Sequence, residues 1–304
     1  MNILVWIILC LIWGSTWIFI KIGLDAGLPP ITFSVARFGL AVVILAPLIK
    51  LLGFRMPSTR SEWKLIGLTG FLQFSLNYSA VFWSEQYITS GLAAVLQATI
   101  TVFGLLLAWF FLPSEKITKA KIFGVALGVV GVAVIFIDQL RVESRMAFFG
   151  CVAIVAGAYA AAQASILVKA RASGLHPASL LFSQMVCGLP AIIAYALIAE
   201  GNPLKLTWSW TAILCVVYLT VAGTIAAFWL YYWLLGRIES TRAMMISLVT
   251  PLLAVVIGAV FLGETLPPQT FFGGLLIIAS IGLIVIKRRT EPPSRRDAEE
   301  IQTG

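Results

Sequence analysis

The chain alternates between long apolar runs and short polar connections. A helix needs about 20 mostly apolar residues to cross the hydrocarbon core of a bilayer, and each run is long enough, or nearly so. We therefore expect an all-α integral membrane protein with ten transmembrane helices. The predicted ranges are 3–21, 31–51, 63–83, 90–112, 120–137, 146–168, 177–198, 208–235, 243–262 and 270–286.

The basic residues are distributed unevenly between the two sides of these runs. Of the 21 Lys and Arg residues, 16 lie in or beside the even-numbered connections or after the last run, four lie in or beside the odd-numbered connections, and Arg37 lies well inside the second run. Lys and Arg are enriched in cytoplasmic loops. This bias predicts that both termini are cytoplasmic, which requires an even number of spans.

The second half of the sequence resembles the first. Identical pairs at a shift of 150 residues are Trp83/Trp233, Ile88/Ile238, Ser90/Ser240, Ala93/Ala243, Phe111/Phe261 and Leu112/Leu262. Five runs are an odd number, so the second half enters the membrane in the opposite direction. We expect two inverted five-helix repeats over 1–140 and 146–287, followed by a cytoplasmic tail over 288–304. In transporters, such repeats enclose a site between them and give alternating access to it.

Composition supports a membrane protein and excludes several other classes. Hydrophobic residues make up 60% and charged residues 11%, whereas soluble domains hold about 25% charged residues. The net charge of +8 does not indicate nucleic-acid binding, because the basic residues are scattered over short connections. The four cysteines lie in apolar runs without a CxxC pair, so we expect no disulfide, metal or cofactor.

Several motifs resemble those of EamA-type transporters of the drug/metabolite transporter superfamily. They are WGSTW at 13–17, ARF at 36–38, YITSGLAA at 87–94, LPSE at 112–115, RIESTRA at 237–243, TP at 250–251 and FLGE at 261–264. The resemblance covers about 4–287, and it implies ten helices in two inverted units around a central cavity. It also implies export of amino acids, related metabolites or toxic compounds, while relatives carry nucleotide sugars or phosphorylated sugars. Pro113, where the second copy has Gly263, departs from the pattern.

Polar and aromatic side chains inside the runs are candidates for substrate binding, because a polar group that faces lipid is costly. The candidates are Trp13, Ser15, Thr16, Arg37, Asn77, Tyr78, Gln97, Tyr159, Gln163, Gln184, Thr224, Trp229 and Ser247. An alternative remains open for each of them. Ser, Thr and Gln also bond neighbouring helices, and aromatic rings also pack in the core or in interfacial belts.

Charged residues bear on the substrate class. No run holds a carboxylate near its middle, and Glu85 and Glu115 fall at run ends. Arg37 could meet a substrate carboxylate or phosphate, reach the outer headgroups, or bond carbonyl groups. The combination favours zwitterionic or anionic metabolites over lipophilic cations, although an aromatic cage would bind cations without a carboxylate. Glu115 and its counterpart Glu264 are interpreted as gating residues, helix caps or solvated helix ends.

Other functional classes lack their usual residues. The only histidine is His176 and no run holds two carboxylates, so we expect no enzyme. A channel would need a carbonyl filter or a ring of like charges. We therefore expect a secondary transporter in the bacterial inner membrane that exports amino acids or related zwitterionic or anionic compounds. The alternative is a multidrug or organic-cation exporter.

The expected partners are a small-molecule substrate and the lipid bilayer. The glycines Gly124 and Gly128 form a close-packing face, which serves either a dimer or packing within one chain. We expect a monomer rather than a homodimer. The substrate's identity and the coupling ion do not follow from the sequence.

Overall fold

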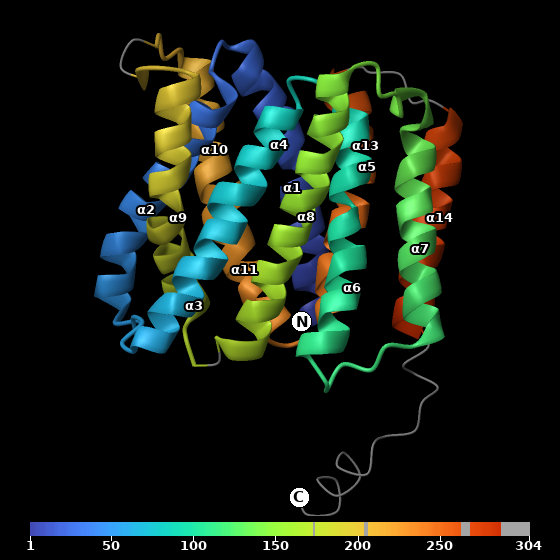
Figure 1. Ribbon diagram of the computed structural model, residues 1–304, viewed down its shortest axis with the longest axis horizontal. Helices are drawn as coiled ribbons and strands as arrows, with labels where there is room; N and C mark the ends of the chain where they lie inside the picture. The colour runs from blue at the N-terminus through green and yellow to red at the C-terminus, as the bar shows by residue number, and fades with distance from the viewer. Residues whose placement is uncertain (173, 204–205, 263–267, 287–304) are drawn as a thin grey trace, which may run out of the picture.

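The computed structural model describes residues 1–172, 174–203, 206–262 and 268–286. This part of the chain is helical and contains no β-strand (Figure 1). The first half holds α1 (Asn2–Asp25), α2 (Pro30–Leu52), α3 (Arg60–Gly70), the π-helix η1 (Phe71–Asn77), α4 (Tyr78–Ser84), α5 (Ser90–Gln97), α6 (Thr99–Phe111), α7 (Lys119–Ile135) and the short η2 (Ile137–Gln139). The second half holds α8 (Arg145–Arg171), α9 (Pro177–Ala199), α10 (Trp210–Thr220), the π-helix η4 (Val221–Ala226), α11 (Ala227–Leu235), α12 (Ser240–Met244), α13 (Ile246–Leu262) and α14 (Pro268–Ile286).

Eight helical segments in the described residues are long and apolar enough to cross a membrane. The prediction of an all-helical membrane protein is confirmed. The predicted runs 120–137 and 270–286 correspond to α7 and α14, which are not among the eight. The count of ten spans therefore stays a prediction.

Two of the predicted runs contain a π-helical segment where the sequence pattern indicates a continuous α-helix. The segments η1 and η4 begin at Phe71 and Val221, 150 residues apart, which is the shift that aligns the two halves of the sequence. A π-turn disturbs the regular backbone ladder and is often found at functional sites. In η4 the Gly223 carbonyl accepts hydrogen bonds from Trp13 Nε1 at 3.3 Å and Arg37 Nη2 at 3.1 Å. Tertiary contacts thus satisfy this part of the backbone.

The two halves are interleaved rather than set side by side. The most extensive helix contacts all join one half to the other: α7 with α14, α1 with α13, α6 with α8, α2 with α9, and α4 with α8. In Figure 1 α7 and α14 form a pair at one edge of the bundle. The largest hydrophobic core cluster also spans both halves and includes Leu9, Phe38, Phe74, Leu181 and Met185.

The glycine face of α7 packs within the chain. Ser280 Oγ on α14 donates to the Gly124 carbonyl at 2.6 Å, and a Cβ on Gly131 would lie 2.8 Å from the Gly273 carbonyl oxygen. Only glycine permits this approach of two helix backbones. Of the two interpretations of this face, packing within one chain is the one observed, and the monomeric state stays a prediction.

The bundle has two ends, which we call the basic end and the opposite end. The basic end holds the connections 53–59, 112–118, 174–176 and 236–239, and lies at the lower edge of Figure 1. The opposite end holds 26–29, 85–89 and 136–144. Trp6 Nε1 donates to the Arg242 carbonyl, and Arg242 Nη2 donates to the Ile284 carbonyl, both at 3.0 Å. The first helix therefore starts, and α14 ends, at the basic end.

Some predicted features lie outside the described residues. These are Gly263 and Glu264, which belong to the second-half counterpart of the Glu115 motif, and the tail 288–304.

Candidate functional site

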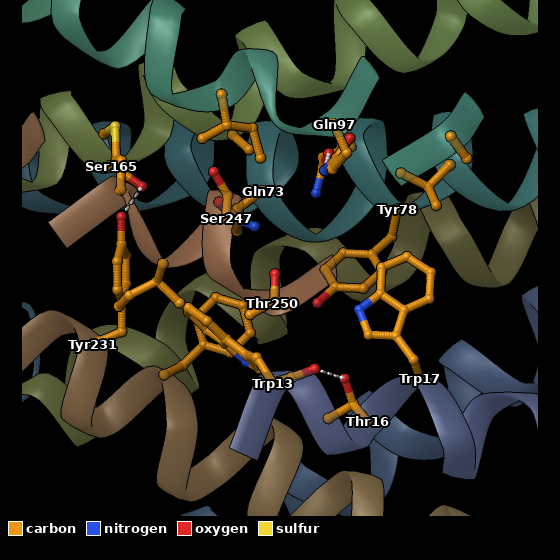
Figure 2. Close-up of a pocket in the computed structure, with 18 of the residues that line it drawn as sticks. Trp13, Thr16, Trp17, Gln73, Tyr78, Gln97, Ser165, Tyr231, Ser247 and Thr250 are labelled. Atoms are coloured by element: carbon orange, nitrogen blue, oxygen red, sulfur yellow. Dashed lines mark hydrogen bonds between the residues drawn. The ribbon is translucent and has the colours of Figure 1, made fainter. Parts of the chain in front are cut away.

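A cavity of about 210 Å³ lies between the two halves. It is lined by α1, α2, η1, α4, α5 and α6 from the first half, and by α8, α11, α12 and α13 from the second. Figure 2 shows its side chains, with Trp13 and Trp17 on one side of the space and Gln97 on the other. Seven of the thirteen predicted site residues line it: Trp13, Thr16, Arg37, Asn77, Tyr78, Gln97 and Ser247.

Trp13 forms part of the wall between α1 and α11. Its indole N–H donates to the Gly223 carbonyl, and its ring contacts Phe228 and Tyr231 with centroids 5.5 and 5.4 Å away. Thr16 Oγ1 donates to the Trp13 carbonyl at 2.7 Å, one turn along the same helix. A rigid aromatic wall with a fixed polar tip suits a substrate that carries apolar and polar parts.

Arg37 is buried, with 4% of its surface exposed. Its Nε donates to Thr224 Oγ1 at 2.6 Å and its Nη2 to the Gly223 carbonyl at 3.1 Å. The guanidinium lies 5.7 Å from the Tyr78 ring centroid. Of the three roles considered for Arg37, it therefore bonds a carbonyl group and does not reach the headgroups. A guanidinium carries five N–H donors, more than these two contacts use, and it also lines the cavity.

An amide pair lies across the cavity from the tryptophans. Gln97 Nε2 donates to Asn77 Oδ1 at 3.1 Å. The buried Gln97 Oε1 has no hydrogen-bond partner within the part of the chain that the structure describes. Nearby, Ser247 and Thr101 share a hydrogen bond of 2.8 Å. A buried acceptor without a partner is costly, so this position favours a ligand that donates a hydrogen bond.

Three predicted site residues bond neighbouring helices instead of lining the cavity. Ser15 shares a 2.6 Å hydrogen bond with Tyr218. Gln184 is fully buried and its Nε2 donates to Thr69 Oγ1 at 2.7 Å. Thr224 is the acceptor for the Arg37 side chain. Their placement matches the alternative of helix packing.

Three more predicted residues also lie outside the cavity. Tyr159 is 46% exposed on the surface of α8 and contacts the Phe103 ring edge-on. Gln163 is half-buried and does not line the cavity. Trp229 packs near the basic end, where its ring meets His176 edge-on at 5.2 Å. The sequence places these side chains within runs, but it does not tell which way they face.

Other lining residues were not among the thirteen. Trp17 completes the WGSTW motif, and Gln73 lies within η1. Tyr231 donates from its hydroxyl to Ser165 Oγ at 3.1 Å, in the part of the cavity nearest the basic end. Glu85 lies at the opposite end. Of these, Trp17 and Gln73 had a sequence signal, because Trp17 belongs to the motif that supplied Trp13 and Gln73 is a polar side chain inside the third run.

A buried ion pair closes the bundle at the basic end. Lys169 Nζ lies 2.8 Å from Glu115 Oε1, and the Glu115 side chain is 6% exposed. The same carboxylate accepts from Ser240 N at 2.9 Å and from Ser240 Oγ at 2.6 Å. Lys169 also donates to the carbonyls of Leu235 and Ile238. Glu115 belongs to the first half and its partners to the second, so it is a buried link between the halves and not a solvated helix end.

A second ionic link lies beside the first. Lys121 Nζ is 2.9 Å from Glu239 Oε1, and Glu239 Oε2 is 3.0 Å from Arg242 Nε. Lys121 belongs to α7 in the first half, whereas Glu239 and Arg242 belong to the second. The basic end is therefore joined across the two halves at two neighbouring places.

At the opposite end the cavity reaches Glu85, the residue that follows α4. No ion pair or hydrogen bond to this half-buried carboxylate is present in the part of the chain that the structure describes. Burial raises the pKa of Glu85 to about 7. Among the described residues, none from the basic-end connections lines the cavity. Within the described residues, the cavity lining thus extends to the opposite end and does not reach the connections of the basic end.

Comparisons with known proteins agree with this architecture. The model of the EamA-like transporter family matches residues 1–137 and 148–286. A solved crystal structure has a TM-score of 0.80 at 16% identity, over 96% of this chain and 99% of that one, and so shares the fold.

Several curated relatives are transporters. A probable terminal-alkyne amino-acid exporter of Streptantibioticus cattleyicolor is 31% identical over 91% of this chain and 90% of its own length. A probable amino-acid metabolite efflux pump of Salmonella typhimurium is 28% identical over 95% and 96%. An uncharacterized inner membrane transporter, YedA of Escherichia coli K12, is 27% identical over 97% and 94%.

Proposed function

Since the chain belongs to the EamA-like transporter family, we propose that this multi-pass membrane transporter exports amino acids or related zwitterionic or anionic metabolites. It is a secondary transporter of the bacterial inner membrane and works by alternating access. The observation that carries this proposal is the cavity, which lies between the two halves and extends to the opposite end, while ion pairs join the halves at the basic end.

The cavity's chemistry supports the substrate class. Arg37 supplies a buried cation with N–H donors for a carboxylate. Gln97 Oε1 offers an acceptor for an ammonium or hydroxyl group. The aromatic rings of Trp13 and Phe228 suit an apolar side chain. Relatives named as amino-acid exporters support the same class.

Several observations support ten spans in two inverted repeats over 1–140 and 146–287. The family model matches two separate segments of this chain. The packing pairs are also arranged symmetrically, because α1 packs on α13 as its counterpart α8 packs on α6. In addition, α7 packs on its own counterpart α14, and α2 on its counterpart α9. An axis in the membrane plane would generate this pattern.

We assign the basic end to the cytoplasm, because Lys and Arg are enriched in cytoplasmic connections. Both chain termini then lie in the cytoplasm, and the cavity faces the periplasm. The relative named as an inner membrane transporter supports the choice of membrane. A reporter that is active only in the periplasm, fused at Gly304, should give no signal.

Counterflow in proteoliposomes tests the transport function. Proteoliposomes that contain the purified protein would be loaded with unlabelled alanine, leucine or phenylalanine. Uptake of the same labelled amino acid from outside would then be followed. We expect saturable uptake that falls at least about tenfold in Arg37→Gln, because one charge-assisted hydrogen bond is worth about 1.5–3 kcal/mol. The exposed Tyr159→Phe serves as a matched control and should transport normally. Uptake of no amino acid by well-folded protein would refute the substrate class.

One observation favours a second candidate, the export of organic cations. Trp13, Trp17, Tyr78 and Phe228 surround the space with aromatic faces, and Glu85 adds a carboxylate at one end. Aromatic faces bind quaternary ammonium groups. A quaternary ammonium compound would therefore be included as a competitor. If it alone is transported, and Arg37→Gln transports it equally well, the second candidate replaces the first.

A further inference from the structure

Among the described residues, two charged side chains line the cavity, and they differ in whether they have hydrogen-bond or ion-pair partners. Arg37 is held by Thr224 and the Gly223 carbonyl. Glu85 lies at the opposite end of the cavity, half-buried beside lining residues such as Val81 and Phe82. The carboxylate forms no ion pair or hydrogen bond in the part of the chain that the structure describes.

Two other acidic residues near helix ends, Glu115 and Glu200, are held by partners. Glu115 is held by Lys169 and Ser240. Glu200, also at the opposite end, accepts from the backbone N–H groups of Ile31 and Thr32 at 2.8 and 2.6 Å. Glu85 differs from these two because it lines the cavity and, among the described residues, has no ion-pair or hydrogen-bond partner.

The elements around Glu85 carry several charged and titratable groups. They are Lys21 and Asp25 on the last turns of α1, Arg37 on α2, Tyr78 on α4, Tyr87 in the following connection, Glu143 and Arg145 at the start of α8, and Tyr195 and Glu200 near the end of α9. Within the described part of the chain, the groups on α2, α4, α8 and α9 form no ion pair or hydrogen bond with the Glu85 carboxylate. Desolvation is the cause that raises the pKa of this carboxyl to about 7. The group is thus half-protonated close to neutral pH.

We propose that Glu85 is a proton-binding site of the cavity, loaded from the opposite end, that couples inward proton movement to the outward movement of the substrate. This inference rests on the proposed function. In the observed state the carboxylate takes up a proton through the open end of the cavity, after the substrate has left. The proton neutralises the group, and the opposite end then closes around a neutral carboxyl, which is far less costly to bury than a carboxylate. The same proton leaves to the basic end when the cavity opens there.

Infrared difference spectroscopy tests proton binding without any substrate. Purified protein would be titrated from pH 5 to pH 9, and the C=O band of protonated carboxyl groups would be followed. We expect a component with a midpoint near 7 that is missing in Glu85→Gln and present in Glu143→Gln, an exposed control. Glu85→Asp, which keeps a carboxyl group, should keep a titrating component. A component that persists in Glu85→Gln, or no component above pH 6 in the unaltered protein, would overturn the assignment.

Transport measurements then test the coupling. A pH gradient that is acidic on the side of the cavity's open end should accelerate the efflux of labelled amino acid by the unaltered protein. We expect Glu85→Gln to lose this acceleration, whereas its counterflow without a gradient should continue. Acceleration equal to that of the unaltered protein would overturn the coupling. If no amino acid is transported by any form, the proposed function fails, whereas the infrared titration still decides whether Glu85 binds the proton.

Discussion

Among the described residues, Glu115 at the basic end and Glu85 at the opposite end are two carboxylates in contrasting surroundings. At the basic end, Glu115 and Lys169 form a buried pair between the halves, and Lys121 and Glu239 form a second link. At the opposite end, Glu85 faces the cavity without a partner in the described residues. Removing one member of a buried ion pair is costly, whereas the whole pair adds little net stability over an apolar contact. Such a link resists the loss of either charge, but the whole pair can separate when both charges find new partners.

The difference is not that the opposite end lacks contacts between the halves. Glu200 of the second half binds the start of α2 in the first, but neither Glu200 nor its partners Ile31 and Thr32 line the cavity. The contact between Glu200 and the start of α2 can therefore persist while the residues that line the cavity separate. The comparison teaches that closure depends on where the links lie relative to the cavity.

Accessibility from the two sides gives the largest expected effect. Val81→Cys, in a chain whose four native cysteines are replaced by alanine, places a thiol in the cavity near Glu85. A membrane-impermeant maleimide should label it about a hundredfold faster in right-side-out vesicles than in inside-out vesicles, if the alternative state is populated at about 1%. Equal rates would show that the basic end is not closed. Faster labelling in inside-out vesicles would reverse the assignment of the two sides.

Removing the carboxylate of Glu115 should weaken the closed state. Glu115→Ala leaves the Lys169 ammonium and the Ser240 N–H without their acceptor. Breaking a buried pair costs about 3–5 kcal/mol, part of which falls on both states. We expect the labelling ratio of Val81→Cys to fall by about tenfold. An unchanged ratio would mean that this pair does not determine which end is open.

The fold was largely predictable because hydrophobic length is a local property of the sequence. The run 177–198 became α9, which spans Pro177–Ala199. The π-helices were not predicted, because their backbone groups are satisfied by distant residues, as when Arg37 donates to Gly223. No local pattern records such a contact.

The candidate site was predictable in part, for a related reason. A membrane helix is apolar all round, so no stripe marks the face that looks inward. Composition therefore selected Trp13 and Gln97, which line the cavity, together with Gln184 and Trp229, which do not. Glu85 was set aside because it lies at a run end, yet the cavity extends to that end.

A smaller effect is expected from the second ionic link. Lys121→Met keeps the apolar stem of the side chain but removes the ammonium that contacts Glu239. Glu239 is partly exposed and retains Arg242 as a partner, so the loss should be about 0.5–1 kcal/mol. We expect the labelling ratio of Val81→Cys to fall about two- to fivefold. A fall as large as that of Glu115→Ala would show that the two links act as one unit.

The smallest effect is expected from an exposed ion pair at the same end. Arg55 Nη2 lies 2.6 Å from Glu62 Oε1, but both residues belong to the first half and the Arg55 side chain is 51% exposed. Glu62 also accepts from the backbone N–H of Thr59 in a capping box, a role that glutamine performs equally well. Glu62→Gln should therefore leave the labelling ratio of Val81→Cys unchanged. A clear fall would show that charge at the basic end in general holds it closed, rather than the two links that join the halves.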